Sequence, residues 1–298
     1  MTKNYYHRPT VIVSSTQDPA STNMKSTLLN ESAWVENEMF FDSPTYKHQR
    51  LDDLYLITIP DKTIIHENLE DELKKNLNLE PTRLIFISRH RSKTGEPTLT
   101  THPIGNYGAA DFGGMEKTLT RSLPHEMARL LRIMKSRAKA EGLSHHVCYE
   151  VTHHGPYLKI PTLFAEVGSD EKEWQNLDAC RVVALSVLEM LETESKSSST
   201  EPTGTVLVGV GGGHYAPRFT DVCLTKKAAF GHMIPTYHIK TGIIDEEMLR
   251  KTLDATPNVR GIYLHKKAMK KSDVTYFKEI SVQLDVPIVS SSEIPDLE

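Results

Sequence analysis

The sequence predicts an α/β protein in which a mixed β-sheet is covered by helices on both faces, in three layers. Short apolar runs alternate with longer segments of helical periodicity along nearly all of the 298 residues, the order typical of α/β folds. Some runs are apolar throughout, as expected of strands buried on both faces of a sheet. No internal repeat is visible, and we expect a single α/β domain over residues 1–298.

The first third of the chain predicts strands and helices in alternation. In chain order we expect a strand over residues 10–14, a helix over 19–30, a turn-rich segment over 40–47, a strand over 54–59, a helix over 68–76 and a strand over 83–88. This β-α-β-α-β order is typical of a parallel sheet with crossover helices.

A polar, glycine-rich segment follows over residues 89–114. It is too polar for core and too long for a simple connection, and loops of this length are usually functional or disordered. We expect an ordered binding loop, with a flexible lid as the alternative. Its candidate ligand-contacting residues are His90, Thr100, Thr101, His102 and Asn106.

The remaining sequence continues the alternation. We expect helices over residues 122–141, 179–191, 245–253 and 274–284, and strands over 147–151, 162–168, 205–210, 261–265 and 286–289. Residues 195–204, SKSSSTEPTG, have the composition of an exposed mobile linker.

Composition limits the classes of function. The formal net charge of −4, from 35 basic and 39 acidic side chains, means that the whole molecule does not attract polyanions, so contact with a nucleic acid must be local. Three widely spaced cysteines argue against a disulfide framework and a cysteine-based zinc motif. No apolar run is long enough to span a membrane, and the first residues carry no signal core. We expect a cytoplasmic monomer.

The stretch GVGGGHYAPR, residues 209–218, directly follows an apolar run. Consecutive glycines allow positive φ angles, so the amides of Gly211, Gly212 and Gly213 could converge on a phosphate or an oxyanion. His214 stands where the run stops. The alternative is that the glycines form only a tight turn and that His214 is an ordinary surface histidine.

A second cluster, EVTHHGP, also follows an apolar run. Glu150 lies in an otherwise apolar strand, where a carboxylate needs a cation or a hydrogen-bond donor. His153 and His154 are adjacent, so one is expected in the site and the other in support, unless Gly155 makes a turn that brings both inward.

Together these segments predict a composite site with several imidazoles and few thiols. Its candidate members are Glu150, Glu166, His90, His102, His153, His154, His214 and His232. Such a set permits zinc with nitrogen and oxygen ligands, or a metal-free general base with an oxyanion hole. The spacings match neither the HExxH zinc motif nor the GxSxG nucleophile elbow. For each single histidine, a hydrogen bond to loop backbone remains the simple alternative.

Positive charge is concentrated in HKKAMKK, residues 265–271, after the expected strand GIYLH. Basic runs are commonly solvated surface. This run lies at the carboxyl end of a strand, where open α/β folds bind ligands, so Lys266 and Lys267 could hold a polyanionic substrate.

The blocks SRH, LTTHPIGNYG, CYEVTHHGP, FAEVGS, VGGGHYAPR and AFGHMIP, in this order from about residue 85, closely resemble the D-aminoacyl-tRNA deacylase family of the archaeal and plant type. The resemblance implies a fold similar to phosphorylases and peptidyl-tRNA hydrolases, hydrolysis of the ester between a D-amino acid and tRNA, and dependence on zinc. Two positions depart from the family pattern, Arg218 in place of lysine and His238 after Tyr237.

If the resemblance holds, roles follow for the candidate residues. His153, His154 and His214 would activate water or bind zinc, and Glu150 and Glu166 would orient or ligate, with His232 a further candidate metal ligand. The amides of residues 211–213 would bind the oxyanion or the terminal phosphate. Arg218, Lys266 and Lys267 would hold the end of the tRNA that carries the D-amino acid.

Two other classes of protein stay open on the sequence alone. A phosphorylase-like or nucleosidase-like enzyme would use the glycine turn to bind phosphate. A non-enzymatic RNA-binding module would use only the basic residues, although the negative net charge and the histidine-rich loops make it the weaker alternative.

Overall fold

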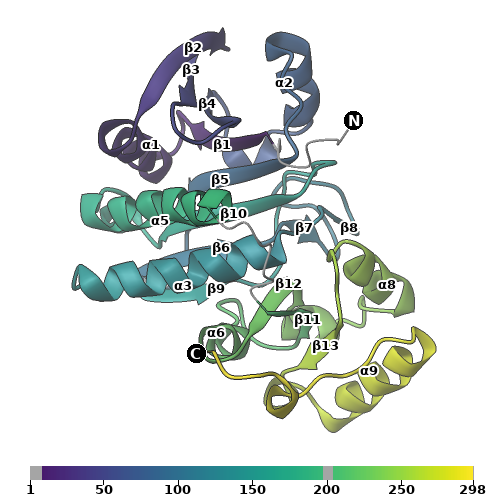
Figure 1. Cartoon of the computed structure of the whole chain (residues 1–298). Coiled ribbons are helices and arrows are strands. Elements are labelled where there is room, and N and C mark those ends of the chain that lie inside the picture. Colours follow the sequence, from purple (N-terminus) through teal and green to yellow (C-terminus); the bar gives the residue numbers. More distant parts are fainter. Residues whose placement is uncertain (1–8, 197–203, 298) are drawn as a thin grey trace, which may run out of the picture.

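The computed structural model describes residues 9–196 and 204–297. Within these residues the largest element is an eight-stranded sheet with the strand order β2-β3-β4-β1-β5-β10-β6-β9 (Figure 1). Its strands are β1 (Thr10–Ser15), β2 (Trp34–Phe40), β3 (Ser43–His48), β4 (Leu54–Ile59), β5 (Arg83–Arg89), β6 (Thr98–His102), β9 (His146–Tyr149) and β10 (Thr162–Gly168).

The centre of the sheet is parallel and its margins are mixed. Strand β1 pairs in parallel with β4 and β5, and β5 pairs in parallel with β10. On one side β6 runs antiparallel to β10, and β9 then runs parallel to β6. The central strands are apolar because both of their faces are covered.

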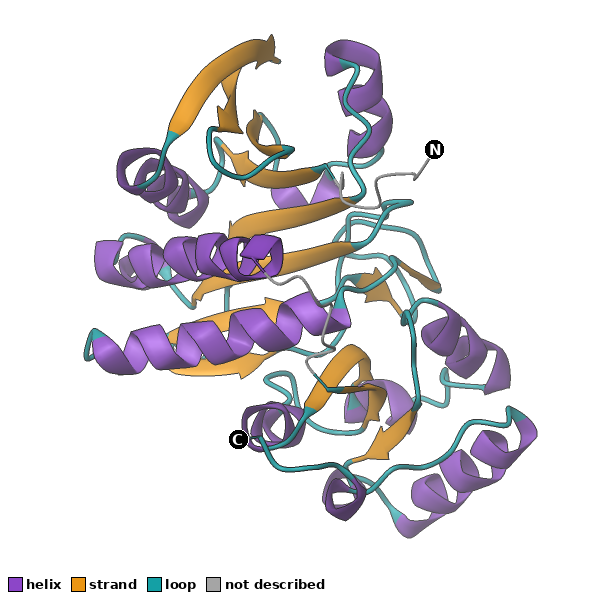
Figure 2. Cartoon of the chain, viewed as in Figure 1, coloured by secondary structure: helices purple, strands orange, loops and turns teal. Residues whose placement is uncertain are grey.

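Helices cover both faces of this sheet, which confirms the predicted α/β class. Helices α1 (Pro19–Glu31), α3 (Pro124–Ala140) and α5 (Leu177–Lys196) lie side by side on one face (Figure 2). On the other face α2 (Leu69–Leu77) contributes Leu69 and Leu73 to a second core with apolar residues of β1, β4 and β5. The part of this second face that α2 does not cover is more polar, and the candidate site lies there.

The C-terminal part forms a separate parallel sheet, which the alternation of elements did not predict. Strands β11 (Thr205–Val210), β12 (Ala228–Ile234) and β13 (Gly261–Leu264) have the order β12-β11-β13. Around them lie α6 (Pro217–Thr225), α7 (Thr236–Lys240), α8 (Glu246–Asp254) and α9 (Lys271–Gln283). Helix α3 contacts both the large sheet and β12, so it joins the two parts. The expected single domain over residues 1–298 stays a prediction.

Most expected elements are present, two expectations need correction, and one lies mostly outside the described residues. Residues 40–47 are not only turns, because β2 and β3 pair there as a hairpin. Residues 286–289 do not form a strand. Only Ile288 bridges to Ile262, and the neighbouring Pro287 has no amide to donate to a ladder. Most of the expected linker over 195–204 lies outside the described residues.

The segment over 89–114 is also more ordered than a loop. Residues Thr98–His102 form β6, buried between β10 and β9, and Gly105–Asn106 form the short β7, which pairs with β8 (Thr118–Leu119). The threonines and His102 give β6 the polar composition that is typical of a loop. Their polarity is explained by a polar site inside the protein, which β6 lines.

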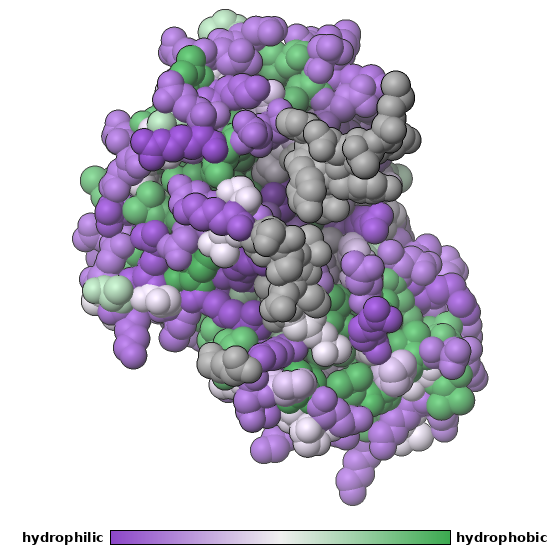
Figure 3. Space-filling model, viewed as in Figure 1, coloured by the Kyte–Doolittle hydropathy of each residue, from purple (hydrophilic) through white to green (hydrophobic). Residues whose placement is uncertain are grey.

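The molecular surface is mostly polar. In the face shown in Figure 3, hydrophilic residues predominate and apolar residues are scattered among them. None of the helices in the described ranges is both long and apolar enough to cross a membrane.

Candidate active site

The candidate site lies on one face of the large sheet, across the neighbouring strands β5, β10, β6 and β9. Glu166 of β10 pairs in register with Ser88 of β5 and Thr100 of β6. Because side chains on paired strands alternate between faces in step, His90 and His102 end on the same face as Glu166. Glu150, directly after β9, completes this group.

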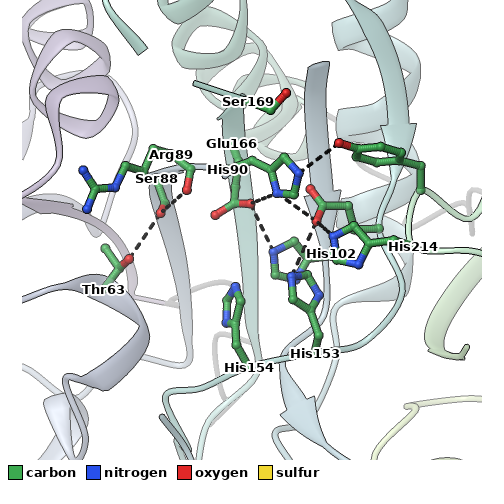
Figure 4. A network of polar contacts seen from close by, with 12 residues as sticks. Thr63, Ser88, Arg89, His90, His102, His153, His154, Glu166, Ser169 and His214 are labelled. Carbon is green, nitrogen blue, oxygen red and sulfur yellow. Dashed lines mark hydrogen bonds and ion pairs between the residues drawn. The ribbon is translucent and has the colours of Figure 1, made fainter. Parts of the chain in front are cut away.

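Glu150 is the centre of the site, and its side chain is fully buried. Its Oε2 lies 2.7 Å from His214 Nε2, 3.1 Å from His90 Nδ1 and 3.5 Å from His153 Nε2. Figure 4 shows these three imidazoles directed toward one another. Burial would raise the pKa of Glu150, but His90 and His214 together hold it well below its ordinary value. Glu150 is therefore an anion at neutral pH.

Glu166 is a second buried carboxylate in the same group. Its Oε2 lies 3.4 Å from His102 Nε2 and 3.7 Å from His90 Nδ1. Burial lowers the pKa of His90 and His102, yet the carboxylates raise it more, so the pKa of each histidine lies above its ordinary value. The two carboxylates and these histidines thus form one electrostatic unit across the strand ends.

His153 and His154 are held by backbone carbonyls. Nδ1–H of His153 donates to Val151 O at 2.7 Å, and Nδ1–H of His154 donates to Gly155 O at 2.6 Å. Because a carbonyl only accepts, each ring keeps its proton on Nδ1 and its lone pair on Nε2. Burial and the neighbouring His102 lower the pKa of both residues, that of His154 to about 3. Both rings are neutral bases.

His154 adopts a left-handed backbone, with φ of 42°. This turn lets both adjacent histidines approach His102, whose ring centroid lies 4.4 Å from that of His153 and 4.9 Å from that of His154. The expectation from the sequence was that one of the two histidines would lie in the site and the other in support. The structure brings both to it.

Several buried polar atoms in this group lack a hydrogen bond of good geometry. They include both carboxylate oxygens of Glu150, Nε2 of His102 and Oγ1 of Thr100. The neutral ring of His153 turns its lone pair toward the Glu150 carboxylate, an arrangement that a cation between them would stabilise. Three overlapping groups have ligand atoms within 4.8 Å of one another: His102, His153 and His154; His90, Glu150 and His214; and His102, Glu150 and Glu166. Nitrogen and oxygen donors of this kind suit zinc.

The glycine turn positions His214 but does not offer three amides. Gly211 donates its amide to Ile234 O at 2.8 Å, and Gly212 donates to Thr236 Oγ1 at 2.7 Å. These two amides are therefore not free for an oxyanion, which corrects the sequence-based assignment. Gly213 is exposed, and a Cβ added there would meet no atom within 4 Å. Of the three glycines, only this residue faces open space.

Two further predicted residues lie away from the site. His232 is buried, with Nε2 donating to Thr120 O at 2.9 Å and Nδ1 3.1 Å from Thr152 Oγ1. With both nitrogens engaged it has no lone pair for a metal, so its prediction as a ligand is wrong. Thr101 pairs with Ala165 and lies on the opposite face of β6 from Thr100, toward α3, so it does not line the site.

Asn106 supports the site rather than facing it. Its side-chain amide donates to Gly113 O at 2.8 Å, and so holds the segment over residues 112–115. Sequence reasoning missed Glu67, whose Oε1 accepts from the Gly114 amide and whose Oε2 accepts from the Tyr157 amide, each at 2.8 Å. Glu67 therefore links that segment to the loop that carries His154. A glutamate in the charged stretch just before α2 gave no signal of this.

Tyr215 is a second residue that was missed. Its hydroxyl lies 3.2 Å from His90 Nε2, and its ring packs against that of His214. Its position beside His214 in the glycine-rich motif was the available signal.

The predicted basic residues lie near the glycine turn but outside the carboxylate and histidine group. Arg218, Lys266 and Lys267 all line one cavity of about 330 Å³. His265, which lines the same cavity, lies against Gly212.

The site has no activated nucleophilic thiol, since burial and Glu150 raise the pKa of Cys148, the cysteine of this face, well above its ordinary value. Buried carboxylates beside imidazoles are an arrangement that enzymes use to remove a proton from water. An α/β fold that carries such a site is consistent with a hydrolase. The comparisons narrow this class: a sequence model described as D-aminoacyl-tRNA deacylase matches residues 77–289, and the chain belongs to that family.

Relatives named D-aminoacyl-tRNA deacylase cover nearly the whole chain. The protein of Pyrococcus abyssi is 33% identical over 282 residues, which are 94% of this chain and 98% of the relative. That of Methanosarcina mazei is 35% identical over 296 residues, which are 98% and 95% of the two chains. A solved structure described as a conserved protein of unknown function, AF0625, superposes with a TM-score of 0.85 at 28% identity and covers 96% of each chain.

Proposed function

We propose that the protein hydrolyses the ester that joins a D-amino acid to tRNA and releases the free amino acid and the tRNA. Membership of the D-aminoacyl-tRNA deacylase family supports this reaction. The observation that carries it is the contact of 2.7 Å between Glu150 and His214, at the rim of a buried histidine group.

His214 would act as the general base. Its Nε2 faces the Glu150 carboxylate, which leaves Nδ1 without a partner among the described residues, and its side chain is 37% exposed. Nδ1 can therefore remove a proton from a water molecule at the mouth of the site. The buried anion of Glu150 would stabilise the imidazolium that forms, as a carboxylate does for other catalytic histidines.

The oxyanion of the tetrahedral intermediate needs donors near His214. The exposed Gly213 amide is the candidate that remains in the glycine turn, and the Tyr215 hydroxyl is a second. The imidazolium of His214 would then return its proton to the ribose oxygen as the ester bond breaks. An aminoacyl ester has a good leaving group, so this modest machinery is sufficient.

We also propose that zinc binds in this site. His102, His153 and His154 would hold it, since Nδ1–H of each donates to a backbone carbonyl and the lone pair of Nε2 is left for a metal. The nearby Glu150 and Glu166 would balance its charge. When bound, zinc would polarise the ester carbonyl or lower the pKa of a water molecule.

The test of the function compares D-tyrosyl-tRNA with L-tyrosyl-tRNA as substrates of the purified protein. Release of amino acid from the D-ester alone is the expected result, and stable D-ester would contradict the proposal. Chelation followed by addition of zinc separates the metal from the reaction. Loss of activity with chelator and its recovery with zinc would support the proposed zinc. Unchanged hydrolysis would support the deacylase reaction and contradict the role of zinc.

Of the alternatives, the family match favours neither the phosphorylase-like or nucleosidase-like enzyme nor the RNA-binding module without activity. The oligomeric state and the cellular compartment stay predictions.

A further inference from the structure

We propose that the basic cavity beside the glycine turn binds a phosphate group, and that this group is the 5′-phosphate of the terminal nucleotide of the substrate tRNA. The inference rests on the proposed function and adds a second recognition site to it. The cavity, of about 330 Å³, lies between α6 and the segment that follows β13.

The charge of the cavity suits a phosphate. Arg218, Lys266 and Lys267 line it, and no carboxylate is among the described residues that do. Glu293 is close enough to Lys266 for its pKa to be affected. Its carboxylate, however, accepts hydrogen bonds from the amide and the hydroxyl of Ser290, at 2.7 and 2.5 Å. Neither lysine forms an ion pair within the described part of the chain, so both remain available to an anion.

Arg218 is held in place before any ligand binds. Its Nε donates to the Tyr263 hydroxyl at 2.9 Å, and its Nη2 donates to Ser291 Oγ at 3.2 Å. A third contact is an ion pair from Nη1 to the Asp221 carboxylate at 2.7 Å, which also holds the guanidinium. A pre-oriented guanidinium binds phosphate oxygens with less loss of side-chain freedom than a mobile one.

His265 also lines the cavity and lies against the glycine turn. Its Nδ1 is buried and has no hydrogen-bond partner. Buried polar nitrogens without a partner are rare in folded proteins. Burial and the neighbouring cations Arg218 and Lys267 lower the pKa of this ring, so the positive charge of the cavity comes from Arg218, Lys266 and Lys267.

The position of the cavity relates it to the ester site. A Cβ on Gly212 would lie 3.3 Å from His265 Nδ1, so the ring lies against the glycine turn. His214 follows two residues later, and two residues span at most about 7 Å. The cavity and the proposed general base are thus separated by a distance on the scale of one nucleotide. The carboxyl ends of β11 and β13, which meet here, are where parallel sheets commonly bind ligands.

The experiment uses two small esters, 3′-O-D-tyrosyl-adenosine and the same ester with a 5′-phosphate. The wild-type protein should cleave the phosphorylated ester with a kcat/KM at least about tenfold higher, since hydrogen bonds to a charged group are strong. The double variant Lys266→Ala/Lys267→Ala should bring this ratio close to one. Lys278→Ala, on the exposed face of α9, is the matched control and should keep the ratio.

Each outcome separates the phosphate site from the reaction. Equal rates on the two esters in the wild type would overturn the assignment to tRNA while leaving the deacylase intact. Cleavage of neither these esters nor D-tyrosyl-tRNA would instead overturn the proposed function. Inorganic phosphate tests the other source of the ligand, free phosphate. It could raise the Tm of the wild type but not of the double variant while the two esters react equally. The cavity would then bind free phosphate, and its assignment to the nucleotide would be wrong.

Discussion

His214 Nε2 lies 2.7 Å from Glu150 Oε2, although the two residues follow strands of different sheets, β11 and β9. A backbone hydrogen bond of 2.9 Å from the Val151 amide to His214 O fixes this approach. The glycine turn after β11 is therefore fastened directly to the chain that leaves β9. The proposed active site is assembled at this junction between the large and the small sheet.

Replacing Glu150 by glutamine should remove most of the activity with little effect on folding. Glutamine keeps the shape but removes the charge that orients and stabilises His214, so we expect kcat on D-tyrosyl-tRNA to fall by about 100-fold or more. Initial rates of amino acid release measure this. Glu171→Gln, at the exposed start of helix α4 (Glu171–Trp174), is the control and should stay within about twofold of wild type. A fully active Glu150→Gln protein would refute the role of the pair.

Glu67 should act on the reaction only by positioning. Its carboxylate links the Gly114 and Tyr157 amides, so Glu67→Ala frees the loop that carries His154. We expect kcat/KM to fall by about tenfold, which is about 1.4 kcal/mol. This is less than the two lost hydrogen bonds are worth, because they hold the loop and do not touch the reacting atoms. Glu67→Gln should recover part of the loss, because its one oxygen still accepts from one amide.

Limited proteolysis reports the same change independently of activity. The Glu67→Ala protein should be cut faster within residues 111–117 than the wild type, while Glu80→Gln, an exposed residue after α2, should be cut at the wild-type rate. Unchanged cleavage together with unchanged kcat/KM in Glu67→Ala would contradict the positioning role of Glu67.

His232 should make the fold sensitive to acid. Burial lowers its folded pKa to about 4 from 6.5, so between these values the unfolded chain binds more protons than the folded one. Stability from this group is present above pH 6.5 and is lost as the pH falls. From pH 7 to 5.5 the loss is about 1 kcal/mol. The measurement is urea unfolding with chelator present. From pH 7 to 5.5 the free energy of unfolding of His232→Asn should fall by about 1 kcal/mol less than that of the wild type. An equal fall in both proteins would contradict the assignment.

The zinc content of a variant should depend on which histidine is replaced, and not on how many histidines remain. His102→Ala should lose most of its bound zinc, as measured by elemental analysis after dialysis, because His102 belongs to two of the candidate ligand groups. The control, His146→Ala, removes an exposed histidine of β9 and should bind as much zinc as the wild type. Equal zinc in both variants, or none in the wild type, would rule out zinc at this site.

The sequence predicted strands β1, β4, β5, β9 and β10 of the large sheet, because they are continuous apolar runs. It did not predict the hairpin of β2 and β3, whose residues are more polar and more exposed. It could not predict the separation of β11, β12 and β13 into a second sheet, since alternation of elements does not say which strands pair. It also failed at β6. Thr98, Thr100 and His102 line a buried polar site, and their polarity is the pattern of a loop.

Within the site, the sequence identified the histidines and carboxylates, which stand out at the ends of apolar runs. It could not separate His232, whose nitrogens are both occupied, from His102, because hydrogen-bond partners are set by distant segments. For the same reason it assigned the amides of Gly211 and Gly212 to a ligand, whereas Ile234 and Thr236 accept from them.

The most direct test of the account measures amino acid release from D-tyrosyl-tRNA and L-tyrosyl-tRNA by the wild type and by His214→Asn side by side. We expect the wild type to cleave the D-ester and spare the L-ester, and the variant to lose about a thousandfold in kcat on the D-ester while remaining folded. Wild-type rates in His214→Asn would contradict the proposed general base. Failure of the wild-type protein to cleave the D-ester would contradict the function itself.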